Sequence, residues 1–211
     1  SLELDLNSSN LFNYDRYSGN DRIESGTRLN YGILFKKTDS NKRNLSGSLG
    51  QTYNNNKQDL FNKNSGFENK RSEIVGNIIF TDASYDLSYD YRLSESFNLN
   101  RNNFTVQAKT KNLVLRSSYI QLKDFASTEN SDTEQINYGF DYNINKSWTI
   151  NFYQLRDLAG ATYSLPLRTN IGIQFSNECT ALQLTYTRDR SYSIDIPAAT
   201  NLSFNIKLFG F

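Results

Sequence analysis

Apolar and polar side chains alternate along most of this chain with a period of two. From Asn201 to Leu208, every even position is apolar and every odd position is polar. Successive side chains of a β-strand point to opposite faces, so this run predicts a strand with one apolar and one polar face. No stretch has a clear helical period. The sequence therefore predicts an all-β fold.

The same alternation recurs upstream and predicts eleven strands joined as an antiparallel meander. A further partial strand is expected at residues 1–6, which brings the total to about 11–12. The first full strand is expected from about residue 26 and the last at residues 200–209. The run at 112–123 is the weakest, because Val114, Ile120 and Leu122 break the alternation.

Composition excludes several classes of function. With 23 Lys and Arg against 22 Asp and Glu, the net charge is +1, so the chain lacks the basic surface of a nucleic-acid binder. It has no His and one Cys, which excludes Ser-His-Asp and Cys-His catalysis, His-bearing zinc sites and an internal disulfide. The carboxylates, such as Asp86, Asp90 and Asp141, show no spacing that singles out an acid/base pair. We therefore expect no enzyme and no cofactor.

Two architectures give every strand one apolar face: a soluble sandwich and a transmembrane barrel. Most runs have about 9–11 residues, the length of a tilted strand that crosses a bilayer, whereas soluble strands average about 5–6. Charged residues such as Arg28, Lys36 and Lys207 fall on the polar phase. No run of 18 apolar residues predicts a transmembrane helix. Strand length and charge placement favour the barrel.

The connections between the expected strands alternate in length. Short ones lie near 37–42, 81–82, 110–111, 145 and 177–178, and long ones near 7–25, 55–71, 94–99, 124–133, 157–167 and 189–199. Bacterial outer-membrane barrels have short periplasmic turns and longer extracellular loops. The pattern therefore predicts an antiparallel transmembrane β-barrel in the bacterial outer membrane, with the polar rows lining its lumen. The last strand then descends to the periplasm.

The chain ends at Leu208-Phe209-Gly210-Phe211. A terminal Phe after an alternating strand resembles the signal by which outer-membrane barrels are recognised for insertion. Phe209 and Phe211 are therefore candidates for this signal, and the barrel-assembly machinery is an expected partner.

One loop-like stretch carries a specific motif. Arg16-Tyr17-Ser18-Gly19-Asn20-Asp21-Arg22 and the residues up to Arg28 resemble the R-[FY]-S-G-x-D-R-x-E-x-G-x-R stretch of the LptD (OstA) lipopolysaccharide-assembly family. Near the other end, Asn177-Glu178-Cys179 resembles the Cys of that family at the start of the penultimate strand. The resemblance extends from about residue 11 to the C-terminus. The motif residues singled out here are Arg16, Gly19, Asp21, Arg22, Glu24, Gly26 and Arg28.

The resemblance implies an architecture and a transport role. Members of this family have a periplasmic jellyroll domain and a barrel of about 26 strands, which encloses an LptE lipoprotein plug. Lipopolysaccharide arrives through a bridge of periplasmic proteins and leaves through a seam between the first and last strands. Residues 1–211 are then expected to be the C-terminal part of the barrel domain. The expected partners are an LptE-like plug, the bridge proteins, lipopolysaccharide and membrane lipid.

The resemblance also implies roles for particular residues. Cys179 is expected to form a disulfide with a periplasmic domain outside this chain. The motif residues are expected to build a structured loop that shapes the lumen or holds the plug. The last strand is expected to form one side of the seam, where its polar row consists of Asn201, Ser203, Asn205 and Lys207.

Two other functions remain open at the level of the sequence. One is a small stand-alone porin or channel of about 12 strands. The other is a soluble or surface-exposed β-protein, such as an adhesin, which would bury its apolar rows in a core.

Overall fold

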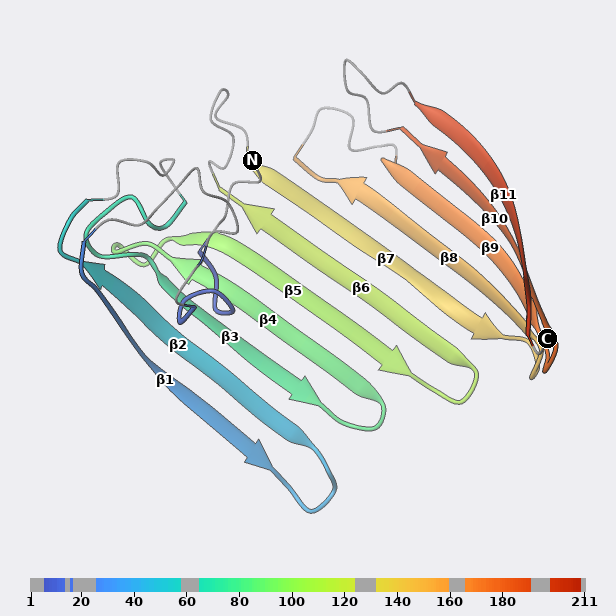
Figure 1. The fold of residues 1–211 in the computed structure, drawn as a ribbon, viewed down its shortest axis with the longest axis horizontal. Helices are drawn as coiled ribbons and strands as arrows, with labels where there is room; N and C mark the ends of the chain where they lie inside the picture. Colours follow the sequence, from blue (N-terminus) through green and yellow to red (C-terminus); the bar gives the residue numbers. More distant parts are fainter. Residues whose placement is uncertain are drawn as a thin grey trace. The chain divides into compact units, whose positions relative to one another are not determined.

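In the computed structural model, the described residues form eleven β-strands that follow one another along the chain (Figure 1). The structure describes residues 6–13, 16, 26–57, 65–123, 132–159, 166–190 and 198–209. The strands are β1 (Arg28–Thr38), β2 (Asn44–Asn54), β3 (Ile74–Thr81), β4 (Tyr85–Leu93), β5 (Leu99–Lys109), β6 (Leu113–Leu122), β7 (Thr133–Asn143), β8 (Trp148–Asp157), β9 (Arg168–Ser176), β10 (Thr180–Asp189) and β11 (Ala199–Leu208).

The order of the strands in the sheet is their order in the chain, from β1 to β11. Neighbours pair antiparallel, as in β1 with β2 and β10 with β11. The predicted eleven-strand antiparallel meander is therefore confirmed. The weak run at 112–123 forms β6, and the first and last strands lie within two residues of their predicted bounds. The partial strand expected at residues 1–6 falls almost wholly outside the described residues.

The described residues contain no helix of sufficient length and apolarity to cross a membrane.

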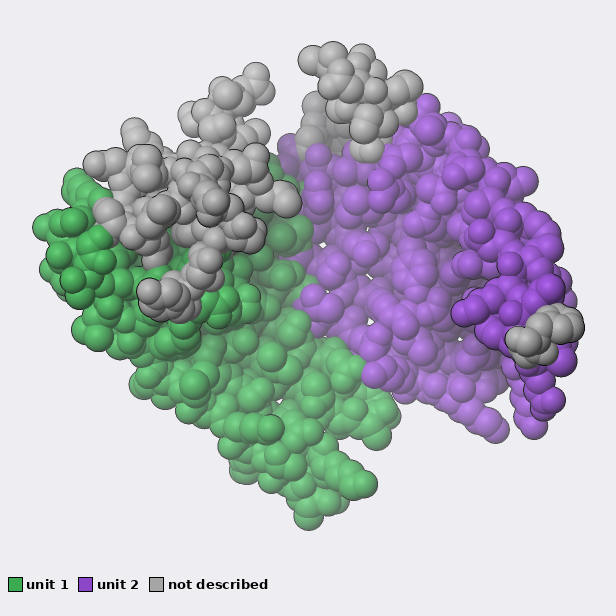
Figure 2. Space-filling view, in the orientation of Figure 1, with its two compact units in different colours: residues 1–104, 120–134 green, residues 105–119, 135–211 purple. Residues whose placement is uncertain are grey.

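The chain divides into two compact units (Figure 2). Unit 1 consists of residues 1–104 and 120–134, and unit 2 of residues 105–119 and 135–211. Unit 1 contains the expected loop motif, and unit 2 contains Cys179 and the last strand.

The alternation of short and long connections is confirmed except at 94–98, which was predicted to be long but has five residues, as many as the short connection 39–43. The connections 39–43, 82–84, 110–112, 144–147 and 177–179 have three to five residues, and in a meander they share one end of the strands. We call this the short-turn end. At the long-loop end, the connections are 55–73, 94–98, 123–132, 158–167 and 190–198, of which only 94–98 is as short as 39–43.

Side chains of Asp and Asn build four of the short turns. Asp39 accepts hydrogen bonds from the backbone N–H groups of residues 41 and 43, and Asp82 from those of residues 84 and 85. Asn145 accepts hydrogen bonds from the backbone N–H groups of residues 147 and 148, and Asn177 from those of residues 179 and 180. At Asp39, the backbone N–H groups of residues 41 and 43 and the Arg43 side chain lower the pKa of the carboxyl from its ordinary value. The Arg43 backbone N–H contributes most. Such side chains mimic a backbone turn, so the reversals are encoded locally.

The apolar rows predicted from the sequence are exposed. Ile33 is 69% exposed in unit 1, and in unit 2 Ile171 is 50% and Leu202 67% exposed. We call this side of the strands the apolar face and the opposite side the polar face. The described residues include only four buried apolar side chains: Leu6, Leu11, Phe67 and Val75. Within the described part of the chain, no second layer covers the apolar rows, which contradicts the sandwich alternative.

Aromatic rings pack against each other along the apolar face of unit 2. Trp148 and Phe175 are register partners near the short-turn end, with ring centroids 5.1 Å apart. Phe140 and Phe152 are partners further along, at 5.9 Å. Such cross-strand aromatic pairs stabilise neighbouring strands by roughly 0.2–1 kcal/mol each. Aromatic pairs of this kind therefore join β7 to β8 and β8 to β9 on the apolar face of unit 2.

An arginine placed in the middle of the apolar face should destabilise the folded barrel. We expect Ile173→Arg in the full-length protein to lower its unfolding free energy in lipid vesicles by about 2–4 kcal/mol, because the side chain would face hydrocarbon. The measurement is urea unfolding followed by tryptophan fluorescence. Gln174→Arg, on the polar face of the same strand, is the matched control. Equal losses in the two variants would contradict a lipid-facing row.

Candidate functional site

The polar face of unit 1 holds the small buried cluster. Leu11 and Phe12 lie against the glycine pair Gly32 and Gly50, which are register partners in β1 and β2. A Cβ on Gly50 would clash with the Leu11 side chain, and one on Gly32 would lie 3.0 Å from the Phe12 ring. The two glycines therefore leave a notch in the polar face that admits the segment 6–13.

Arg16 fastens this segment to the strands. Its side chain is buried, and Nη2 donates to the carbonyl of Leu11, to Oδ1 of Asn30 at 2.9 Å and to Oγ1 of Thr52 at 2.8 Å. The guanidinium also lies over the Phe67 ring, 5.0 Å from its centroid. A buried guanidinium is stable only with such partners, because an unpaired charge away from water is costly. Arg16 is thus the main polar link between the segment and the wall.

The connection 55–73 contributes the other half of the cluster. Phe67 is buried beside Leu6 and Val75, and the Leu6 N–H donates to the Ser65 carbonyl at 3.1 Å. Two sequence-distant segments therefore meet over the polar face of β1 to β4.

Arg92 anchors that connection from β4. It is fully buried, donates from Nη1 to the Ser65 carbonyl at 3.0 Å, and forms an ion pair with Glu73 at 2.6 Å. Burial raises the pKa of the Glu73 carboxyl to about 7, while the Asn100 amide that donates to it opposes the rise. The adjacent guanidinium also favours the carboxylate. The long connection is thus held by a buried charge pair.

The structure describes three of the seven motif residues. Besides Arg16, these are Arg28, which donates to the Asn13 carbonyl at 2.9 Å, and Gly26, which has a φ of +90°. A positive φ favours glycine, because a Cβ would strain the backbone there. The expected roles of Gly19, Asp21, Arg22 and Glu24 lie outside the described residues.

The polar face of unit 2 carries a charged network across β5 to β8. Arg116 donates from Nε to Gln107 at 2.7 Å and from Nη1 to the Tyr153 hydroxyl at 2.6 Å, and it forms an ion pair with Asp141. The Tyr153 hydroxyl donates in turn to Asp141 at 2.7 Å. Because the Arg116 side chain is 42% exposed, this face presents polar groups to water rather than a packed core.

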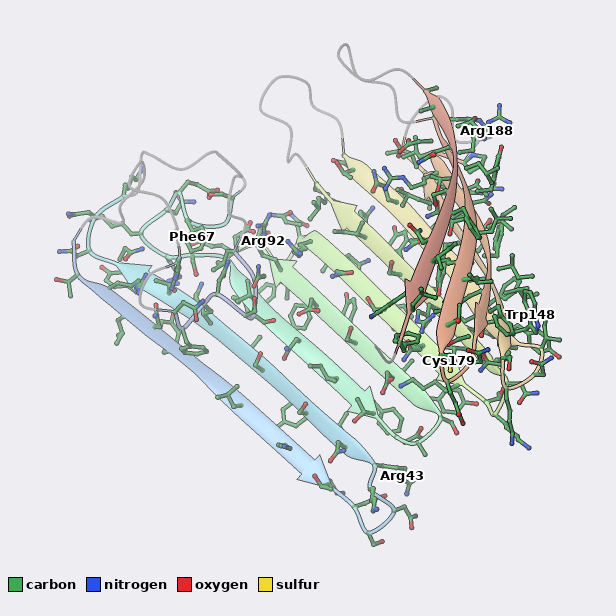
Figure 3. All side chains as sticks on the ribbon, turned by 45° about the vertical axis from the view of Figure 1, so that its right-hand side comes forward. Arg43, Phe67, Arg92, Trp148, Cys179 and Arg188 are labelled. Atoms are coloured by element: carbon green, nitrogen blue, oxygen red, sulfur yellow. The ribbon has the colours of Figure 1, made fainter. Side chains whose placement is uncertain are left out.

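Cys179 lies in the connection 177–179 at the short-turn end, with an exposed free thiol (Figure 3). Its carbonyl accepts a hydrogen bond from the Phe209 N–H at 2.8 Å. The Lys207 ammonium lies over the Phe209 ring, 5.1 Å from its centroid. Cys179 and Phe209 are therefore neighbours, although the sequence separates them by thirty positions. Phe211 lies outside the described residues.

Among the described strands, β11 has one neighbour in the sheet, β10, and the polar row of β11 lies beside the polar row of β10. Asn201, Ser203, Asn205 and Lys207 pair in register with Thr187, Thr185, Gln183 and Ala181. All of the described strand is exposed or half-buried. Its other backbone edge has no partner among the described strands.

Comparison with known proteins decides the family. Residues 1–148 match the model of the family described as "LptD: LPS transport system D". The chain belongs to the LptD family. The resemblance read from the motif at residues 16–28 is therefore confirmed, and the chain is a component of a lipopolysaccharide transport system.

The similarity of the chain to solved structures is weaker than its match to the LptD family model. Two mutants of the porin of Rhodopseudomonas blastica have 8% and 9% identity to the chain, each with a TM-score of 0.45. Each alignment covers 85% of this chain and 79% of the porin. A search of curated proteins finds no match.

Sequence reasoning missed two central residues of this LptD-family site, Phe67 and Arg92. The apolar pair Leu11-Phe12 inside a polar loop was the available signal, since a loop fully in water has no need of two adjacent apolar residues. Arg92 on the polar phase was visible, but its burial depends on a connection that the alternation does not describe.

Removing the Arg16 guanidinium should loosen the segment 6–13. We expect Arg16→Gln to lower the stability of the full-length protein by about 1–3 kcal/mol, because buried acceptors lose a charged donor. Urea unfolding gives the free energy, and limited proteolysis reports exposure of the segment. Lys36→Gln, exposed on the same polar face, should change stability by less than about 0.5 kcal/mol. Unchanged proteolysis in Arg16→Gln would disprove the fastening role.

Proposed function

We propose that this chain is the C-terminal part of an LptD barrel in the bacterial outer membrane, where it helps deliver lipopolysaccharide to the outer leaflet. The family match over residues 1–148 carries the proposal. It is supported by an antiparallel meander whose apolar face is exposed. In this role the chain performs no chemistry. It supplies wall, lumen and exit for an amphipathic lipid.

The two faces suit the two parts of that lipid. The polar face, with Arg116, Asp141 and Tyr153 hydrogen-bonded across strands, can hold water and sugar hydroxyls. The apolar face suits contact with the hydrocarbon of the bilayer. Charged side chains and unpaired backbone groups are costly in that region, and apolar side chains are not. At an edge of the sheet, the head group would therefore lie on the polar side while the acyl chains enter the bilayer on the apolar side.

We assign that edge to β11. Its polar row, Asn201, Ser203, Asn205 and Lys207, would form one side of a seam with the first strand of a barrel of about 26 strands. Eleven strands in a larger barrel would leave both end strands to pair outside this chain, since open edges are not tolerated in hydrocarbon. Two observations support this assignment: β11 has one described neighbour, and its side chains are exposed or half-buried.

The remaining partners follow from the same role. An LptE-like lipoprotein plug would contact the lumen near the motif residues 16–28, and periplasmic bridge proteins would deliver lipopolysaccharide through an N-terminal domain. Cys179 would form a disulfide to that domain, which its exposed thiol at the short-turn end permits. Phe209 and Phe211 would be read by the barrel-assembly machinery.

Depletion of the full-length protein tests the function. Cells whose only copy is under a controllable promoter should stop delivering new lipopolysaccharide to the surface, measured by its modification by an enzyme of the outer leaflet. The wild-type gene should restore delivery, and a gene lacking residues 199–209 should not. Normal delivery after depletion would reject the proposal, and solute flux through the protein in vesicles would favour a porin instead.

Thiol labelling tests the role of Cys179. In the full-length protein from oxidising periplasm, we expect Cys179 to react with maleimide only after reduction, because a disulfide protects it. Cys179→Ser identifies the labelled position. Equal labelling with and without reductant would show that Cys179 is a free thiol.

A further inference from the structure

The apolar face of unit 2 has a groove of about 590 Å³ that crosses β7 to β11. Five of its lining side chains form one continuous row in the strand register: Phe140, Phe152, Ile171, Tyr186 and Leu202. Ile173 and Leu184 line it one step nearer the short-turn end. The volume lies within the range of roughly 300–1,000 Å³ found for sites that hold small ligands. The groove is thus a linear apolar site rather than a flat wall.

The next row of the same face, one step toward the long-loop end, is polar. In register order it consists of Tyr138, Gln154, Thr169, Arg188 and Thr200. The Tyr138 hydroxyl donates to Gln154, whose amide donates to the Thr169 hydroxyl at 3.3 Å. Two residues along a strand span about 7 Å. Polar groups therefore begin about 7 Å from the apolar row.

Arg188 is the cation of this row. It is exposed on the apolar face, between its register partners Thr169 and Thr200 (Figure 3). No side chain in the described part of the chain pairs with its guanidinium, whereas Arg168 on the polar face pairs with Asp189 at 2.5 Å. A guanidinium flanked by two hydroxyls is well suited to phosphate, which accepts several hydrogen bonds and carries negative charge. The row thus offers an anion site directly beside the groove.

We propose that this surface binds one phosphate-bearing lipid, with an acyl chain in the groove and a phosphate on Arg188, Thr169 and Thr200. The order of chemistry, an apolar row and then a cationic hydroxyl row, matches the boundary between acyl chain and headgroup. A protein partner would not require that order. The proposal rests on the function proposed above for the choice of lipid: the long-loop end then faces the outer leaflet, where the lipid is lipopolysaccharide. The site adjoins β11, so it would hold a lipid molecule beside the exit strand.

Photo-crosslinking in the full-length protein tests the site. Leu202→p-benzoylphenylalanine places the reactive group in the groove, and the protein is reconstituted in phosphatidylcholine vesicles that contain lipopolysaccharide. We expect lipopolysaccharide to be crosslinked more than its share of the bilayer. Arg188→Gln should lower the ratio of lipopolysaccharide to phosphatidylcholine adducts about fivefold, the effect of one arginine near an anionic headgroup. Arg188→Lys keeps the charge and should retain most of the enrichment.

The test has a matched control and four outcomes that would overturn the proposal. Arg43→Gln removes an exposed arginine at the short-turn end and should leave the ratio unchanged. Phosphatidylcholine adducts without enrichment, or enrichment insensitive to Arg188→Gln, would overturn the lipid site and leave the transport function standing. A protein adduct would show a protein in the groove and also overturn it. Absence of any lipid adduct would contradict the lipid-facing wall, and so the proposed function as well.

Discussion

Antiparallel backbone pairing between neighbours in the chain is the interaction on which every other feature depends. Each inner strand pairs its N–H and C=O groups with the strands on both sides, β1 and β11 pair on one side, and the register sends alternate side chains to opposite faces. The pairing of Gly32 with Gly50 creates the notch for Leu11 and Phe12, and the pairing of Arg188 with Thr169 and Thr200 creates the cationic row. A slip of one residue in a strand would exchange its faces and destroy the feature that this strand helps to form.

The inverted placement of burial sets this chain apart from a soluble β-protein. Apolar rows such as that of Ile33 are exposed, while the four buried apolar side chains and the buried guanidinium groups lie on the polar face, where Arg16 and Arg92 contact carbonyl, amide and carboxylate oxygens. Burying guanidinium groups costs free energy unless each is paired. The pairs therefore give residues 65–73 and the segment 6–13 a defined position over the polar face, which a few apolar contacts alone would hold less specifically.

The proposed transport role and the proposed lipid site use different faces of the same strands. The network around Arg116 is available to sugars and water, and the groove beside Arg188 to an acyl chain and its phosphate. Both lie in unit 2, which also contains β11.

The sequence by itself determined the strands, their order and their two faces, because period-two alternation and local Asp and Asn turns act between residues close in the chain. It also identified the family, through the motif at residues 16–28, and marked Arg16 and Cys179 as residues of interest. Only the tertiary structure showed that Arg16 lies over Phe67, that Phe209 bonds to Cys179, and that Arg188 stands above an apolar groove. These contacts join residues far apart in the chain, and alternation records which face a side chain occupies but not which distant side chain meets it there.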